Sequence, residues 1–123
     1  MKSHELESWL TDRGDEIVRK NVAGETNLTS QEQLVYEVWL FDTEQRNGGI
    51  SQYFCNRGLD RWNMLLKSAL PALKSFAPIA AQINAVIAGS NDPYLTIVKS
   101  GVNLDEFYRR HSNDLIEELR SLS

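Results

Sequence analysis

The sequence predicts an all-α protein of one domain, and three observations lead to this fold class. Apolar residues recur at helical spacing along nearly the whole chain of 123 residues. Helix-start and helix-stop residues divide these apolar stripes into segments of ordinary helix length. Only residues 94–98 have the β-branched alternation of a strand, and a lone strand would have no partner. We therefore expect about five to seven helices in a single domain over residues 1–123.

The first expected helix covers residues 5–22. Its apolar side chains form an interrupted helical stripe, with Gly14 inside it. The stripe contains Leu6, Trp9, Leu10, Ile17 and Val18. Residues 22–28 contain glycine and asparagine as helix breakers, so we expect a connector there.

The second expected helix covers residues 29–46. Thr29 and Glu32 fit a capping box, in which each side chain accepts a hydrogen bond from the other residue's backbone. An Asn-Gly-Gly turn ends the helix. Its circumference is mostly apolar and leaves a narrow polar strip that holds Glu37 and Glu44. A helix that is apolar nearly all round is surrounded by neighbours, so we expect the 29–46 helix at the centre of the bundle.

Two further helices are expected after the double glycine. A short one runs from Ile50 to Asn56 and ends near Gly58. The next covers residues 59–76, and Pro71 should kink or shorten its last turns because proline cannot donate the helical hydrogen bond.

The last third of the chain completes the bundle. Pro78 fits the first turn of a helix that continues to Gly89. Residues 94–98 are expected to form a short helix or an extended loop. Asp105 begins a final helix whose last apolar residue is Leu122.

Charge is distributed unevenly along the chain, whose formal net charge is −4. Residues 1–48 have ten acids and five bases, whereas residues 49–103 have two acids and five bases. Direct binding to nucleic acid is not expected, because that requires clustered lysine and arginine. A basic protein surface is a better partner, since complementary fields favour the encounter. The alternative is that the acids only keep the surface soluble.

The sequence also excludes several classes of site. Cys55 is the single cysteine, so there is no intrachain disulfide framework, and with His4 and His111 it makes no zinc cluster. We expect Cys55 in the core, both histidines in solvent, and no metal or cofactor. Apolar runs are too short for a membrane span, and the N-terminus is not a signal peptide, so a cytoplasmic protein is expected.

The densest unusual stretch follows the central helix and reads Glu-x-x-Asn-Gly-Gly-apolar-x-Gln-Tyr-Phe-x-Asn. This pattern resembles the bacterial DNA-mimic protein (DMP) family and its domain-of-unknown-function relatives. The segments 34–39 and 104–108 are also similar to that family, so the resemblance covers about residues 30–118. The motif residues are Glu44, Asn47, Gly48, Gly49, Gln52, Tyr53, Phe54 and Asn56.

The resemblance implies an all-helical domain with no known enzymatic reaction. For the best-understood relative it implies dimerisation and an acidic surface that imitates duplex phosphates. That relative binds a transcription regulator in place of DNA. Such mimicry depends on surface carboxylates rather than on the Asn-Gly-Gly motif.

The motif itself is interpreted first as architecture. The two glycines permit a sharp reversal after the central helix. Asn47, Gln52 and Asn56 are expected to satisfy backbone groups left open at two helix ends, while Tyr53 and Phe54 pack back on the central helix. The alternative is that the same polar cluster binds a small ligand or forms an enzyme site.

Three functions therefore stay open: an acidic binding protein, a ligand-binding domain or enzyme, and an oligomeric adaptor without chemistry of its own. The first is favoured, and it needs acids on helix surfaces. Spacings of seven and four residues place the first three candidates on one helical face. The candidate partner-binding acids are Glu5, Asp12, Glu16, Glu25, Glu37 and Glu44. Asp42 instead projects into the apolar arc of the central helix, where it needs hydrogen bonds.

Overall fold

The computed structural model describes residues 2–22 and 27–122, and this part of the chain contains six helices and no strand. The all-α fold class is thereby confirmed. No helix among the described residues is long and apolar enough to cross a bilayer. The helices are α1 (Lys2–Val22), α2 (Ser30–Gly48), α3 (Ile50–Ala69), α4 (Phe76–Ile87), α5 (Pro93–Ser100) and α6 (Leu104–Ser121).

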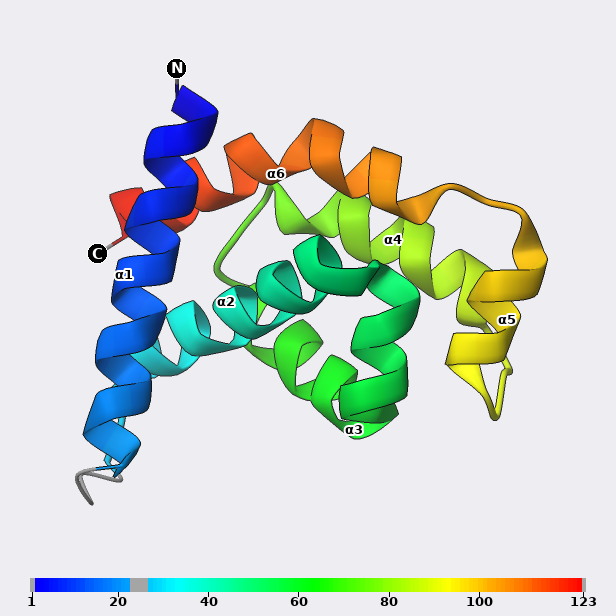
Figure 1. The fold of residues 1–123 in the computed structure, drawn as a ribbon, viewed down its shortest axis with the longest axis horizontal. Helices are drawn as coiled ribbons and strands as arrows, with labels where there is room; N and C mark the ends of the chain where they lie inside the picture. The colour runs from blue at the N-terminus through cyan, green and yellow to red at the C-terminus, as the bar shows by residue number, and fades with distance from the viewer. Residues whose placement is uncertain (1, 23–26, 123) are drawn as a thin grey trace.

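Helix α2 packs against α1, α3 and α6, and α1 lies at one end of the molecule with α5 at the other (Figure 1). Helix α1 packs against α2 and α6, and α2 packs most extensively against α3. Helix α6 runs along α4 and ends beside α1, so the first and last helices meet at the same end of the bundle (Figure 1).

Helix α2 begins with the expected capping box. The Glu32 amide donates to Thr29 Oγ1 at 3.0 Å, and the Thr29 amide donates to Glu32 Oε1 at 3.1 Å. The helix ends at Gly48, two residues later than expected, and Gly49 follows with a φ of 92°. Val35 and Phe41 are almost fully buried, as the central position requires.

Helix α3 consists of two helical segments that meet at a kink, where two helices were expected. Its backbone leaves the helical conformation at Gly58, with a φ of 79°, so the expected boundary is present as a kink. The helix ends at Ala69, before Pro71, and turns lead on to α4. Pro71 therefore shortens this segment, as its missing amide predicts.

Helix α5 resolves the alternative left open for residues 94–98. Pro93 lies at its start, and the Asp92 carboxylate caps it by accepting from the Leu95 amide at 3.1 Å. Helix α6 begins one residue before the expected Asp105 and is capped by the Asn103 side chain.

An aromatic cluster fills the space between α2, α3 and α6. The Phe41 ring lies 4.9 Å from Tyr53 and 5.1 Å from Tyr108, both edge to face. The Tyr53 ring contact with Phe41 confirms that Tyr53 packs back on the central helix, whereas Phe54 is buried against Tyr53 and Trp62 of α3 itself. The expectation that Cys55 lies in the core is wrong, because the next position on the helix turns outward and its side chain is exposed.

Candidate functional site

Two motif amides, those of Gln52 and Asn56, meet at the carboxylate of Glu44 near the end of α2. Gln52 Nε2 donates to it at 3.1 Å, Asn56 Nδ2 at 3.2 and 3.3 Å, and Arg57 Nε at 2.9 Å. All three donors belong to the first turns of α3. The carboxylate therefore ties α3 to α2 across the Gly-Gly reversal.

This arrangement corrects the expected roles of the motif amides. Gln52 and Asn56 do not satisfy open backbone groups at helix ends, because Glu44 accepts their amide hydrogens instead. Asn47 is exposed and borders a shallow hollow with Trp39 on the other side of α2. The sequence shows each of these side chains as polar but not which partner it meets.

The cap of α3 comes from a residue that the sequence analysis did not assign to the site. Asp105 Oδ1 accepts from the Ile50 amide at 2.8 Å and from Gln45 Nε2 at 3.2 Å. A Cβ at Gly49 would lie 3.1 Å from Asp105 Oδ2, so the glycine leaves room for this carboxylate. The similarity of residues 104–108 to the DMP family was the signal that could have pointed to Asp105.

Hydrogen bonds decide the charge state of Glu44. Burial alone would raise the pKa of its carboxyl group. The bonds from Gln52, Asn56 and Arg57 outweigh that effect and lower the pKa below its usual value. Glu44 is therefore a paired anion inside the fold and not a surface charge.

Glu37 is a second buried carboxylate on the same strip of α2. Its side chain is fully buried, and Oε2 accepts from Gln33 Nε2 at 2.7 Å and from Arg61 Nη1 at 2.9 Å. Burial raises the pKa of Glu37 even though Arg61 lowers it in part. The polar strip of α2 faces the arginines of α3, which corrects the expectation that Glu37 and Glu44 are exposed acids.

Asp42 is also buried and satisfied, as its place in the apolar arc requires. The Tyr108 hydroxyl donates to Oδ1 at 2.7 Å, and Arg46 Nε donates to Oδ2 at 2.7 Å. Glu37, Asp42 and Glu44 thus each bind one arginine. They hold the bundle together and are not available to a partner.

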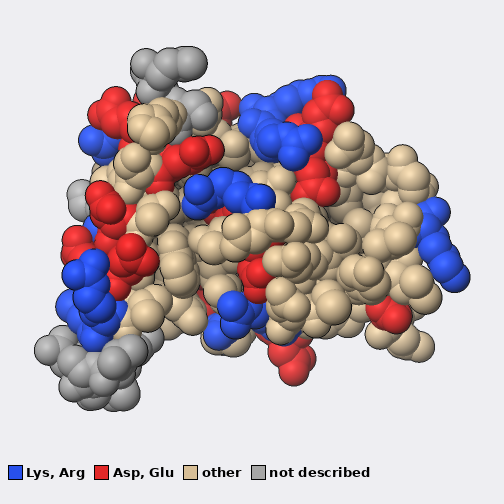
Figure 2. Space-filling view, in the orientation of Figure 1, with Lys and Arg blue, Asp and Glu red and all other residues tan. Residues whose placement is uncertain are grey.

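The exposed candidate acids lie on α1. Glu5, Asp12 and Glu16 are all exposed, and Asp15 adds a fourth carboxylate. Figure 2 shows acidic side chains grouped over this helix at one edge of the molecule. Arg13 binds Glu16 at 3.0 Å, so the row is partly paired. Glu25 lies outside the described residues.

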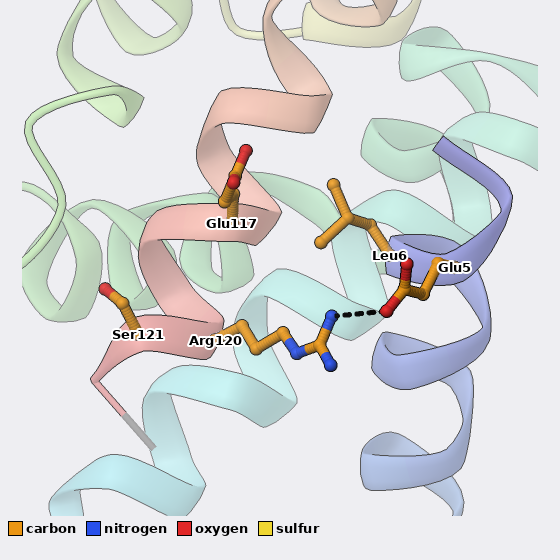
Figure 3. Close-up of a pocket in the computed structure, with 5 residues that line it drawn as sticks. All are labelled: Glu5, Leu6, Glu117, Arg120 and Ser121. Atoms are coloured by element: carbon orange, nitrogen blue, oxygen red, sulfur yellow. Dashed lines mark hydrogen bonds and ion pairs between the residues drawn. The ribbon is translucent and has the colours of Figure 1, made fainter. Parts of the chain in front are cut away.

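A hollow of about 500 Å³ opens between the first turns of α1 and the last turns of α6. Figure 3 shows its lining and the contact from Arg120 Nη1 to Glu5 Oε1, which measures 3.4 Å. Its walls are formed by Glu5, Leu6, Glu117, Arg120 and Ser121.

A second hollow, of about 410 Å³, borders the motif and includes Gln52, Cys55, Asn56 and Tyr94. The two amides there already donate to Glu44, so both side chains are held by a carboxylate of the same chain. Among the described residues no three His, Cys, Asp or Glu side chains gather as a metal site.

Comparison with protein families shows which family the chain belongs to. A family model described as DMP19-like protein matches residues 26–122. The matched region contains α2 to α6 and the whole Asn-Gly-Gly motif, whereas α1 precedes it. Searches of curated proteins and of solved structures find no significant match.

Proposed function

The chain belongs to the DMP19-like protein family, and from this premise we propose that it is a non-enzymatic, acidic binding protein of the cytoplasm. It occupies the basic surface of a DNA-binding regulator, or of another protein directed at nucleic acid, in place of DNA. The family supports the class of function, and the surface of α1 supports the mode of binding.

The exposed row of carboxylates on α1 is the observation that carries this proposal. Glu5 and Asp12 are about 10.5 Å apart along the helix axis, and Asp12 and Glu16 about 6 Å, at a rise of 1.5 Å per residue. Phosphate contacts position a nucleic-acid-binding protein through its long basic side chains. A row of exposed carboxylates offers such side chains charge at comparable intervals.

The local charge of α1 favours a basic partner. Residues 5–16 contain five acids and one base, Arg13, while Arg19 and Lys20 follow at the end of the helix. Lys20 Nζ is bound to Glu32 at 2.6 Å. Residues 5–16 of α1 are therefore a strongly negative stretch of helix, and we assign partner binding to it.

The contacts of the motif residues favour a structural role over a catalytic one. Its Gln52 and Asn56 side chains bind a carboxylate of the same chain, and its aromatic side chains lie in the core. Catalysis would require a group within reach of a substrate. We therefore propose that binding uses α1 and that the motif maintains the fold.

The test compares two triple variants of equal charge change. The first is Glu5→Gln, Asp12→Asn and Glu16→Gln on α1, and the matched control is Asp60→Asn, Glu106→Gln and Asp114→Asn elsewhere on the surface. Partner capture from the native host is measured at low and high salt. The α1 variant should bind more weakly with a flatter salt dependence, because exposed charges are screened. If the α1 variant and the parent capture the partner equally at low salt, the proposal is contradicted.

Helix α5 favours a second property, self-association. Tyr94, Leu95 and Val98 are 41%, 41% and 55% exposed, and they form an apolar face at the end of the molecule opposite α1. Contiguous exposed apolar surface is typical of protein interfaces. We propose a homodimer through α5, which sedimentation velocity tests: Val98→Lys should give monomers, and a monomeric parent at micromolar concentration would contradict it.

A further inference from the structure

The hollow between α1 and α6 combines an apolar floor with acidic walls. Leu6 is almost fully buried and forms the floor, while Glu5 on α1 and Glu117 on α6 contribute carboxylates from two different helices (Figure 3). A volume of about 500 Å³ is ample for one long side chain. The hollow therefore differs from the rest of the acidic row, which lies on a convex helix surface.

The hollow already contains a guanidinium group, that of Arg120. Its Nη1 atom lies 3.4 Å from Glu5 Oε1, a long distance for a charge-assisted hydrogen bond. The two side chains are 44% and 67% exposed. Exposed ion pairs of this kind contribute little to stability, so this contact is easily exchanged.

We propose that this hollow receives an arginine side chain of the basic partner, which displaces Arg120 from Glu5. This inference rests on the proposed function and names the group that the acidic surface recognises. Arg120 is then an internal competitor that weakens binding.

Arginine fits the lining better than lysine does. Its methylene stem packs on apolar surface such as Leu6 while its charged end remains among polar groups. Its planar guanidinium has several donors in a fixed fork, which suits binding to both oxygens of the Glu5 carboxylate. Lysine has a compact, strongly hydrated charge and gains less from the apolar floor.

The experiment titrates the full chain, labelled with ¹⁵N, with N-acetyl-Arg-Arg-amide and with the corresponding dilysine compound, and follows backbone amide shifts. Shifts should be largest at residues 5–6 and 117–121 and should saturate at lower concentration for the arginine probe. Glu5→Gln should reduce them. The variants Arg120→Gln and Arg109→Gln each remove one positive charge from an exposed position on α6. Only Arg120 lines the hollow, so their difference in affinity reports the effect of freeing Glu5.

Arg120→Gln should bind the arginine probe about two- to five-fold more tightly than Arg109→Gln, the range of an exposed ion pair. Equal affinities of these two variants would overturn the inference. So would shifts that are largest at residues 12–16 or absent throughout the chain. None of these outcomes changes the salt-dependent capture by the α1 triple variant, so the proposed function is judged separately.

Discussion

The Tyr108 hydroxyl donates a 2.7 Å hydrogen bond to Asp42 Oδ1 and joins α6 to α2 inside the core. Both side chains are buried. Burial raises the pKa of Asp42, and the bonds from Tyr108 and Arg46 offset only part of that rise. Asp42 therefore depends on both donors, which lie on two different helices.

Tyr108→Phe should destabilise the protein by about 1.5–3 kcal/mol, the usual range for a hydrogen bond to a charged group. The ring remains in the core, so the loss reports the hydroxyl and not a cavity. Urea denaturation measures it. Tyr94→Phe, at an exposed position, is the control and should change the free energy of unfolding by less than about 0.5 kcal/mol. Equal effects of the two changes would contradict the assigned bond.

The free energy of unfolding of the Glu37→Gln variant should increase relative to that of the parent as pH rises. The pKa of Glu37 is raised by burial, so the folded protein binds its proton more tightly than the unfolded chain does. Its contribution to stability is full below the unfolded pKa and is lost as pH rises through the folded pKa. Glutamine is neutral at every pH and still accepts from Gln33 and Arg61.

Urea denaturation of parent and variant at pH 4 and pH 8 checks this prediction. Comparison of the two proteins at each pH removes the effect of groups that titrate in both. A free-energy difference that does not change with pH would show that Glu37 has no raised pKa in the folded protein.

Glu44→Gln should show the opposite dependence on pH. The pKa of Glu44 is lowered overall, so its contribution is present above the unfolded pKa and is lost as pH falls through the folded pKa. An amide would also turn donors toward Gln52 and Asn56. We expect a loss of about 1–3 kcal/mol at pH 7 that shrinks toward pH 3 in urea denaturation. A loss of equal size at both pH values would refute the charged role of Glu44.

For Glu37 and Glu44, the sequence predicted the position on the helix but not the partners. Period and polarity placed Glu37 and Glu44 on one strip of α2, and that placement is right. Period alone cannot tell whether a polar strip faces water or the arginines of another helix. The arginine partners of the strip are remote in sequence: Arg61 is 24 residues from Glu37, and Arg57 is 13 residues from Glu44.

The helices were more predictable than the contacts, because caps and breakers act locally. The capping box at Thr29 and the shortening by Pro71 both followed from local chemistry. Gly58 was expected to end a helix, and the helical backbone conformation is interrupted there, at the kink of α3. A breaker marks a change of direction, but packing against α2 decides whether the helix resumes.

Gly49→Val should lower stability by about 1–3 kcal/mol, because the backbone there has φ 92° and ψ 170°, a region that glycine alone adopts readily. Gly58→Val is the matched control: its backbone has a similar conformation, with φ 79° and ψ 179°, and open space surrounds it. Chemical denaturation should give a larger loss at Gly49, where the new side chain also approaches Asp105. An equal loss at both sites would show that the approach to Asp105 does not contribute to the loss at Gly49.

Gly14 sets how closely α1 lies on α2. A Cβ at this position would lie 2.3 Å from the Trp39 ring, so an alanine requires the ring or the helix to move. Inside a helix, glycine to alanine favours stability by about 0.5–1 kcal/mol. Overpacking costs about 1–3 kcal/mol, which outweighs that gain.

Gly14→Ala should therefore destabilise the protein by about 1–2 kcal/mol and change the fluorescence of Trp39 in the folded state. Urea denaturation and emission spectra measure the two effects, and Ser8→Ala, at an exposed position of the same helix, is the control. Displacement of α1 should also increase amide hydrogen exchange along residues 5–20, since the acidic row is held in place by this contact. A variant that is more stable than the parent would mean that Trp39 turns aside freely and that Gly14 does not position α1.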